Sequence, residues 1–254
     1  MDLGIAGKKA LVCASSKGLG KGCALALAEA GVDLVLNARG SKALNETAEA
    51  IRSRFNVRVE AVVADITTPE GQEEVLTRAG AVDILVNNAG GPPPGMWSDW
   101  GRDDFMAALN ANMLTPIALM SRLLPTMIEK GWGRVVNITS QSVKAPIAVL
   151  GLSNSARAGL TGYVAGTARQ VAPFGVTISI FCRAFTIPTA SCLLIRKCPN
   201  RKGSRWNRWL KNALRLSPRG VTAPLRNSGQ HVHLSVPSTQ ALWSDRTYCL
   251  MEVR

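Results

Sequence analysis

Two glycines near the start of the chain have the spacing of a loop that binds a diphosphate. The apolar run 10–12 leads into a loop of small residues, 13–20, that contains Gly18 and Gly20. The stretch 21–30 is rich in Ala and Leu, which favour helix,. A unit of strand, loop and helix places free backbone N–H groups and the positive end of a helix dipole at one point. Because glycine lets phosphates approach the backbone, we expect a nucleotide site here, the alternative being an ordinary small-residue turn.

Three further polar residues, Asp65, Asn88 and Ser140, each come at or just after the end of an apolar run. The carboxyl ends of parallel strands share one edge of a sheet, and ligands of such sheets bind there. We therefore expect these three side chains beside the Gly-rich loop. Their chemistry suits hydrogen bonding to a nucleotide and to a polar substrate.

The elements that would hold these residues alternate along the chain. Six strands alternating with helices predict an α/β fold of the Rossmann type, a doubly wound parallel sheet with helices on both faces. The expected strands are 10–12, 32–36, 58–64, 82–86, 133–138 and 175–181, and the expected helices are 21–30, 41–55, a helix from 69, 103–129 and 151–172.

Composition divides the chain into two parts. The net charge of +13 suggests nucleic-acid binding until it is divided: residues 1–181 hold 17 Lys and Arg against 15 Asp and Glu, whereas residues 182–254 hold 13 against 2. We assign 1–181 to an NADP-binding Rossmann domain and 182–254 to an atypical basic tail. The tail shows no helical or strand periodicity, so we expect it to be irregular. The sequence contains no apolar run of about 18 residues, so it predicts no membrane span. The N-terminus lacks a signal-like pattern, so we expect a cytoplasmic protein. The six cysteines show no metal-ligand or disulfide spacing,.

Residues 6–181 resemble the short-chain dehydrogenase/reductase family, in particular its members related to 3-oxoacyl-[acyl-carrier-protein] reductase. The family's loop Thr-Gly-xxx-Gly-x-Gly corresponds to 13–20, with Cys and Ala at its first two positions, and its Asn-Asn-Ala-Gly motif to 87–90. Asn112 and Ser140 match two residues of the family's catalytic tetrad. The resemblance implies oxidoreductase activity between a carbonyl and an alcohol, a small-molecule substrate, and a family-like homo-oligomer that the unusual tail puts in question. The implied cofactor residues are Ala14, Ser16, Lys17, Gly18, Leu19, Gly20, Arg39, Asp65, Ile66, Asn88, Ala89, Gly90 and Arg157.

The cofactor is expected to be NADP(H) rather than NAD(H). An acid at the end of the second strand would bond the ribose hydroxyls of NAD and repel a 2′-phosphate. We place Asn37 at that position, with Arg39 close behind and Lys17 beside the loop. Two cations and no acid favour the phosphorylated cofactor, although a lone Arg is also a common solvated surface charge.

The resemblance fails at the proton donor. The family has Tyr thirteen residues after the Ser, and Lys four residues later; here those positions hold Ser153 and Arg157. Their spacing of four keeps both on one helix face, so we assign them to the catalytic site with Ser140 and Asn112. A serine hydroxyl is a much weaker acid than a phenol, and Arg cannot relay a proton.

Three interpretations of this change remain open. A substitute acid could act, and Lys144 is the nearest candidate, although a solvated loop lysine explains it as well; Tyr163 fits the core better than the site. Altered activity could use Ser140, Asn112 and an ordered water. The chain could also be a catalytically silent NADP-binding protein.

The tail has the composition of a sequence in another reading frame. Regrouping its possible codons one base earlier permits L-P-G near 181 and D-G-G near 253, two family landmarks in their expected order. We hypothesise a one-base deletion or two-base insertion near codon 181, so that the chain would be the defective product of a frameshifted gene. The tail's charge would then be accidental. A nucleic-acid binder acting through 183–226 is the remaining alternative, but Trp206 and Trp209 are isolated and match no nucleic-acid module,.

Overall fold

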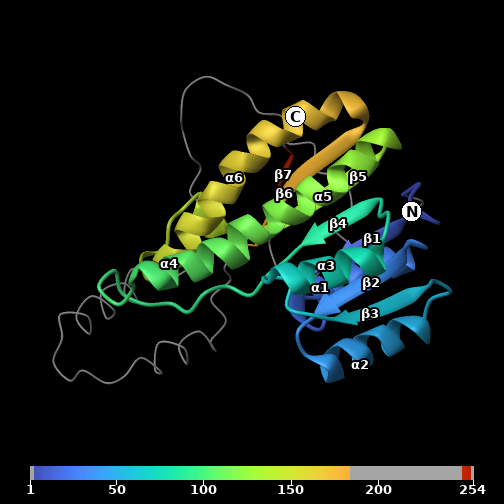
Figure 1. The fold of residues 1–254 in the computed structure, drawn as a ribbon, viewed down its shortest axis with the longest axis horizontal. Helices are drawn as coiled ribbons and strands as arrows, with labels where there is room; N and C mark the ends of the chain where they lie inside the picture. Colours follow the sequence, from blue (N-terminus) through green and yellow to red (C-terminus); the bar gives the residue numbers. More distant parts are fainter. Residues whose placement is uncertain (1–2, 184–247, 253–254) are drawn as a thin grey trace, which may run out of the picture. The chain divides into compact units, whose positions relative to one another are not determined.

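A computed structural model describes residues 3–183 and the backbone of 248–252. The predicted basic tail and the reading-frame hypothesis fall almost wholly on 184–247, which lie outside the described residues. Figure 1 shows the sheet and its helices.

Six parallel strands form the body of the sheet, as the alternation of elements predicts. Their order is β3-β2-β1-β4-β5-β6, followed by the antiparallel strand β7. The order reverses at β1, so the Gly-rich loop and the end of β4 lie at a topological switch point, where such sheets bind ligands. The strands are β1 (Lys9–Val12), β2 (Asp33–Ala38), β3 (Val59–Val63), β4 (Ile84–Asn87), β5 (Gly133–Ser140), β6 (Val176–Arg183) and β7 (Tyr248–Glu252).

Helices cover both faces, because alternate strand residues point to opposite sides. Leu11 packs in a core with α3, α5 and α6, whereas its neighbours Ala10 and Val12 pack in a second core with α1 and α2. The helices are α1 (Gly18–Glu29), α2 (Ser41–Arg52), α3 (Pro69–Ala79), α4 (Arg102–Leu109), α5 (Thr115–Glu129) and α6 (Gly151–Val171), with a π-turn η1 (Asn110–Leu114) and short 3₁₀ turns η2 (Gln141–Val143), η3 (Ala148–Leu150) and η4 (Ala172–Phe174).

Two elements differ from the sequence expectation. The helix expected over 103–129 is divided into α4, η1 and α5, which follow one another end to end beside α6 (Figure 1). The tail, expected to hold no regular element, contributes β7, whose Cys249 and Met251 pair with Cys182 and Ile180 of β6. The antiparallel pairing covers the backbone edge of β6 that a six-stranded sheet would leave open.

Candidate functional site

The loop between β1 and α1 is held by hydrogen bonds to two strands, β2 and β4, and to the helix α2. The Cys13 N–H donates to the Val86 carbonyl at 3.0 Å, and the Ser15 N–H donates to the Asn37 carbonyl at 3.0 Å. Ser16 accepts a hydrogen bond from the Thr47 hydroxyl on α2 at 3.1 Å through its carbonyl. These contacts fix the loop where α1 begins, and the first N–H groups of that helix have no partner within the helix.

The small residues of this loop are required by close approaches. A Cβ at Gly20 would lie 2.3 Å from the Ala14 carbonyl oxygen and 3.0 Å from Asn88 Nδ2, so only glycine fits there. Gly18 has φ +60° and nothing within 4 Å of where its Cβ would be, which leaves that side open to a ligand. Lys17 precedes it as the N-cap of α1 and is exposed, while Leu19 is partly buried against the α1 side of the core.

Ala14 adopts a conformation that glycine would adopt more easily. Its φ is +48°, and among the described non-glycine residues it alone has a positive φ. Asn88 Nδ2 donates to its carbonyl at 3.4 Å, which ties the end of β4 to the loop. Burial raises the pKa of the neighbouring Cys13 thiol to about 12, despite a hydrogen bond from the Asn88 backbone. The Cys13 thiol therefore stays protonated at neutral pH and is a structural group.

The end of β2 differs from the sequence expectation at Asn37. Its side chain is 1% exposed, and Nδ2 donates to the carbonyls of Val62 and Ala64, at 3.1 Å each. Asn37 therefore fastens β2 to β3 and does not face the ligand edge. The strand runs one residue further, to Ala38, and Arg39 is the first charged side chain beyond it.

Arg39 and Asp65 face one another across the ends of β2 and β3. Arg39 Nη1 lies 3.9 Å from Asp65 Oδ2, and their side chains are 79% and 39% exposed. The Thr67 hydroxyl and backbone N–H donate to Asp65 Oδ1 at 2.7 and 3.0 Å. These bonds, with the Arg39 charge, hold the pKa of Asp65 below its usual value. Ile66 points into the core instead.

Asn112 occupies the middle of the π-turn η1, which sequence reasoning did not anticipate. The side chain is 4% exposed; Nδ2 donates to the Ala108 carbonyl at 3.3 Å, and Oδ1 has no hydrogen-bond partner among the described residues. A π-turn is a costly interruption of a helix, and such turns occur frequently at functional sites. The free acceptor is a place for a water molecule or a ligand hydroxyl.

Ser153 and Arg157 form a buried pair on α6. The Ser153 side chain accepts a hydrogen bond from Arg157 Nε at 3.1 Å, and Arg157 Nη1 donates to the Ile138 carbonyl of β5 at 3.0 Å. They are 6% and 8% exposed. Burial, together with the charge of Arg183, lowers the pKa of Arg157 to about 10. The guanidinium is therefore still charged at neutral pH.

A small cavity of about 10 Å³ brings several predicted residues together. The volume is close to what one water molecule needs,. Arg157 supplies charge to the cavity wall, three asparagines supply hydrogen-bonding groups, and the other lining residues are apolar. The lining residues are Asn87, Asn88, Ala89, Asn112, Pro116, Ile138, Arg157 and Leu160. Gly90 follows this lining at an exposed position, and nothing lies within 4 Å of where its Cβ would be.

Ser140 lies at the end of β5, outside the residues that line this cavity. Its Oγ accepts a hydrogen bond from the Ser142 N–H at 3.2 Å and caps the turn η2. Lys144, the substitute acid considered above, is exposed at the end of that turn, and Tyr163 packs against the core. Arg183, which sequence reasoning did not single out, pairs in register with Ser140. Only the register of two distant strands reveals that proximity.

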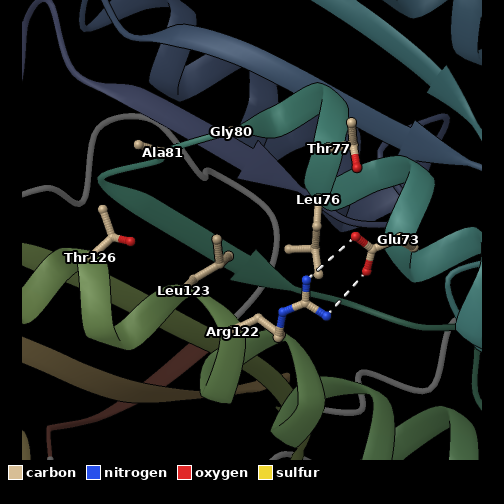
Figure 2. A pocket seen from close by; sticks show the side chains of 8 residues that line it. All are labelled: Glu73, Leu76, Thr77, Gly80, Ala81, Arg122, Leu123 and Thr126. Atoms are coloured by element: carbon tan, nitrogen blue, oxygen red, sulfur yellow. Dashed lines mark hydrogen bonds and ion pairs between the residues drawn. The ribbon is translucent and has the colours of Figure 1, made fainter.

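A second pocket, of about 220 Å³, lies between α3 and α5. Figure 2 shows its lining, with Arg122 of α5 reaching Glu73 of α3 through Nη1 to Oε2 at 3.1 Å. None of the predicted site residues lines it. Among the described residues, no group of three or more His, Cys, Asp or Glu could hold a metal ion. No helix in residues 3–183 is both long and apolar enough to cross a membrane.

Comparison with known proteins connects this geometry to one family. The family model described as short chain dehydrogenase matches residues 8–191. Ketoacyl reductase HetN of Nostoc sp. is 29% identical over 189 residues, covering 73% of this chain and 66% of the relative. The oxidoreductase YvaG of Bacillus subtilis is 35% identical over 147 residues, covering 58% of this chain and 56% of the relative. The chain thus spans less than two thirds of the length of both.

Two solved structures share the fold. L-sorbose reductase from Gluconobacter frateurii, solved with NADPH and L-sorbose, has a TM-score of 0.72 and 26% identity, covering 84% of this chain and 82% of that chain. A xylitol dehydrogenase solved with NAD⁺ has a TM-score of 0.67 and 23% identity, covering 76% of this chain and 75% of that one.

Proposed function

The chain belongs to the short-chain dehydrogenase family of oxidoreductases, and we propose that it binds NADP(H) and interconverts a carbonyl and an alcohol. The observation that carries the cofactor choice is the end of β2, where Ala38 is followed by Arg39 and no acid is present. An acid there would repel a 2′-phosphate, whereas Arg binds one through paired N–H donors.

Arg39 is available for that task. Its distance of 3.9 Å from Asp65 and its high exposure describe a loose surface ion pair, which is worth little in water,. A doubly charged phosphate would compete for the guanidinium, while Asp65 keeps its hydrogen bonds from Thr67. L-sorbose reductase, with its bound NADPH, supports the same choice, and the NAD⁺-bound xylitol dehydrogenase is the counterexample.

The loop fits the diphosphate of such a cofactor. Gly20 permits its close approach to Ala14 and Asn88, and Gly18 leaves open space at the start of α1. Lys17 adds a cation beside the exposed N–H groups,. NADPH would supply the hydride when bound, and this chain's residues would hold the cofactor and orient the substrate oxygen. The proposed cofactor contacts are Ala14, Ser16, Lys17, Gly18, Leu19, Gly20, Arg39, Asp65, Ile66, Asn88, Ala89, Gly90 and Arg157. Ile66, whose side chain packs in the core, would contribute through its backbone.

At the reacting end, Ser140 is proposed to donate a hydrogen bond to the substrate oxygen, and Asn112 Oδ1 to accept one from an ordered water. Ser153 would take the place of the phenol as proton donor. Arg157 already donates to the Ser153 hydroxyl, so its charge would stabilise the negative charge that develops on the Ser153 oxygen,. This arrangement replaces a phenol by a weaker acid, and we expect slow proton transfer. Arg157 would also donate to the cofactor ribose through its remaining N–H groups.

A second function, NADP binding without redox chemistry, is favoured by the burial of this pair. Ser153 is 6% exposed and its oxygen is already engaged by Arg157, which leaves the hydroxyl poorly placed to meet a substrate.

Restoring the family's pair distinguishes the two functions. The double variant Ser153→Tyr with Arg157→Lys is expected to increase carbonyl reduction by NADPH by at least about 100-fold, the lower range for a general acid. A matched control, Ser155→Tyr with Arg157→Lys, puts the phenol on an exposed position of the same helix. NADPH oxidation with a panel of carbonyl compounds is the measurement. Activity in the double variant and none in the parent would identify the parent as silent; equal activity in both would refute the altered proton donor.

A further inference from the structure

Two cysteines occupy the same position in the neighbouring strands β6 and β7. The antiparallel pairing places Cys249 directly opposite Cys182. Both strands belong to one compact unit of the chain. The spacing of cysteines in the sequence gives no indication of this pair, because residues 183–248 separate its two members. Only the register of β6 with β7 brings them together.

The geometry of such a pair suits a disulfide. Directly opposed residues of antiparallel strands have Cα atoms about 4.5 or 5.5 Å apart, depending on whether the pair exchanges backbone hydrogen bonds. The Cα atoms of disulfide-bonded cysteines are about 4.4–6.8 Å apart. Directly opposed residues also lie on the same face of a sheet. A bond between Cys182 and Cys249 therefore requires no change in the register of the two strands.

Cys182 is a free thiol in the interior of the protein. Its side chain is 5% exposed and packs in the core that the sheet shares with α5 and α6. Its Sγ lies 3.5 Å from Thr139 Oγ1 of β5. A buried thiol meets a dissolved oxidant slowly. A partner on the adjacent strand reaches it without passing through solvent.

The other cysteines with described side chains are poor competitors for oxidation. Burial raises the pKa of the Cys13 thiol to about 12 and that of the Cys23 thiol to about 11. Only the thiolate attacks a disulfide, so both thiols react slowly at neutral pH. The cysteine pair of β6 and β7 is therefore the favoured place for a disulfide.

We propose that Cys182 and Cys249 form a disulfide when the protein meets a small disulfide oxidant such as oxidised glutathione, and that this bond fixes β7 to the sheet. The Cys249 thiolate attacks the oxidant and releases one glutathione. The Cys182 thiolate then displaces the second glutathione from Cys249. The two protein thiols are oxidised, and one oxidised glutathione becomes two reduced molecules, which take up the two protons.

The bond lies at the edge of the sheet, beside the candidate site. Cys182 immediately precedes Arg183, which pairs in register with Ser140. Fixing β7 at this place keeps the backbone edge of β6 covered. The cross-link also restricts the unfolded chain, which favours the folded state. Neither effect depends on the proposed function.

The test treats the full chain with oxidised glutathione at neutral pH, blocks the remaining thiols, and identifies linked peptides by mass spectrometry without reductant. The link between Cys182 and Cys249 is expected in at least about tenfold excess over any link to Cys192 or Cys198, because the strand register raises the effective concentration of the two thiols. Bonds spread evenly over the cysteines, or no internal disulfide, would overturn the proposal.

The same oxidation in concentrated urea is the control for the role of the fold. The unfolded chain is expected to give a mixture of links without the excess of the Cys182–Cys249 bond. An equal excess in urea would show that the strand register does not select the pair, and would contradict the proposal.

Variants assign the order of the two steps. In Cys182→Ser, Cys249 is expected to keep its glutathione as a stable adduct, whereas in Cys249→Ser the buried Cys182 remains a free thiol. Cys23→Ser, in α1, is the matched control and leaves the Cys182–Cys249 link unchanged. An adduct on Cys182 and none on Cys249 would reverse the assigned order and refute this mechanism.

Urea denaturation measures whether the bond fixes the strand. The oxidised parent is expected to unfold at a higher urea concentration than oxidised Cys249→Ser, and a reductant is expected to abolish the difference. Equal midpoints for the oxidised parent and the oxidised variant would refute the stabilising role of the bond.

Discussion

In the Gly-rich loop, Ala14 adopts a backbone conformation that suits glycine better than alanine,. Ala14 has φ +48°, a region that costs an L-residue roughly 1–2 kcal/mol and a glycine almost nothing,. The resembling family has glycine at this position, and the backbone here adopts a conformation that glycine favours,. The loop geometry is therefore held by its contacts with β2, β4 and α2 rather than by the residue itself.

We expect Ala14→Gly to stabilise the protein. Relief of the positive φ should raise the free energy of unfolding by about 1 kcal/mol, because the strain removed exceeds the added freedom of the unfolded chain. Urea denaturation measures the change. Ala26→Gly, inside α1, is the control and should lower the same quantity by about 1 kcal/mol,. A destabilised Ala14→Gly would mean that the loop does not strain the alanine.

Gly20 gives the opposite prediction. A methyl group there would meet the backbone carbonyl of Ala14, which cannot move without displacing the loop. Gly20→Ala should weaken NADPH at least about tenfold and lower stability by about 1–3 kcal/mol. Gly162→Ala, in α6 with nothing within 4 Å, should leave NADPH affinity unchanged. Fluorescence titration of both variants makes the comparison, and equal affinities would remove Gly20 from the site.

At the scale of elements, Asp83 joins the starts of three strands at the end opposite the site. Its carboxylate accepts from the Lys9 N–H at 3.0 Å and from Lys130 Nζ, just after α5, at 2.9 Å. The Arg134 N–H donates to its carbonyl. Burial alone would raise the pKa of Asp83, but these donors and the nearby lysine charges hold it below its usual value.

A depressed pKa makes the Asp83 contribution to stability pH-dependent. The contribution is complete above the unfolded pKa, about 3.9, and is lost as the pH falls through the folded pKa. Between the two pKa values only the unfolded state is protonated, so each fall in pH favours unfolding. Asp83→Asn should lower the free energy of unfolding by about 1–3 kcal/mol near pH 7, and this difference should shrink in acid. Urea denaturation across this pH range, with exposed Glu46→Gln as control, tests it. A pH-independent difference would contradict the assignment.

The sequence predicts the order of elements well, since strand length and helix composition are local properties. Three features depend on contacts between distant segments and escape such reasoning. Asn37 is turned toward the β3 carbonyls by register, Asn112 lies in a π-turn, and Arg183 becomes a neighbour of Ser140 through pairing of β5 with β6. None of these has a local signal in residue type or spacing.

At the scale of the whole molecule, positive charge gathers on the ligand edge as well as in the tail. Four cations come from separate elements at that edge: Lys17 before α1, Arg39 after β2, Arg157 in α6 and Arg183 at the end of β6. Of these four cations, only Arg39 has a carboxylate within ion-pair distance among the described residues. A ligand carrying several negative charges, such as the NADPH proposed above, is the natural complement.

Titration of the full chain with NADPH and NADH, followed by tryptophan fluorescence, examines folding, binding and cofactor choice together. We predict saturable binding of both, with NADPH bound at least about tenfold more tightly, from the charge-assisted bonds between Arg39 and the 2′-phosphate. Arg39→Asp should reverse the preference. Tighter binding of NADH, or no saturable binding of either, would contradict the assignment of this chain as an NADP(H)-dependent oxidoreductase.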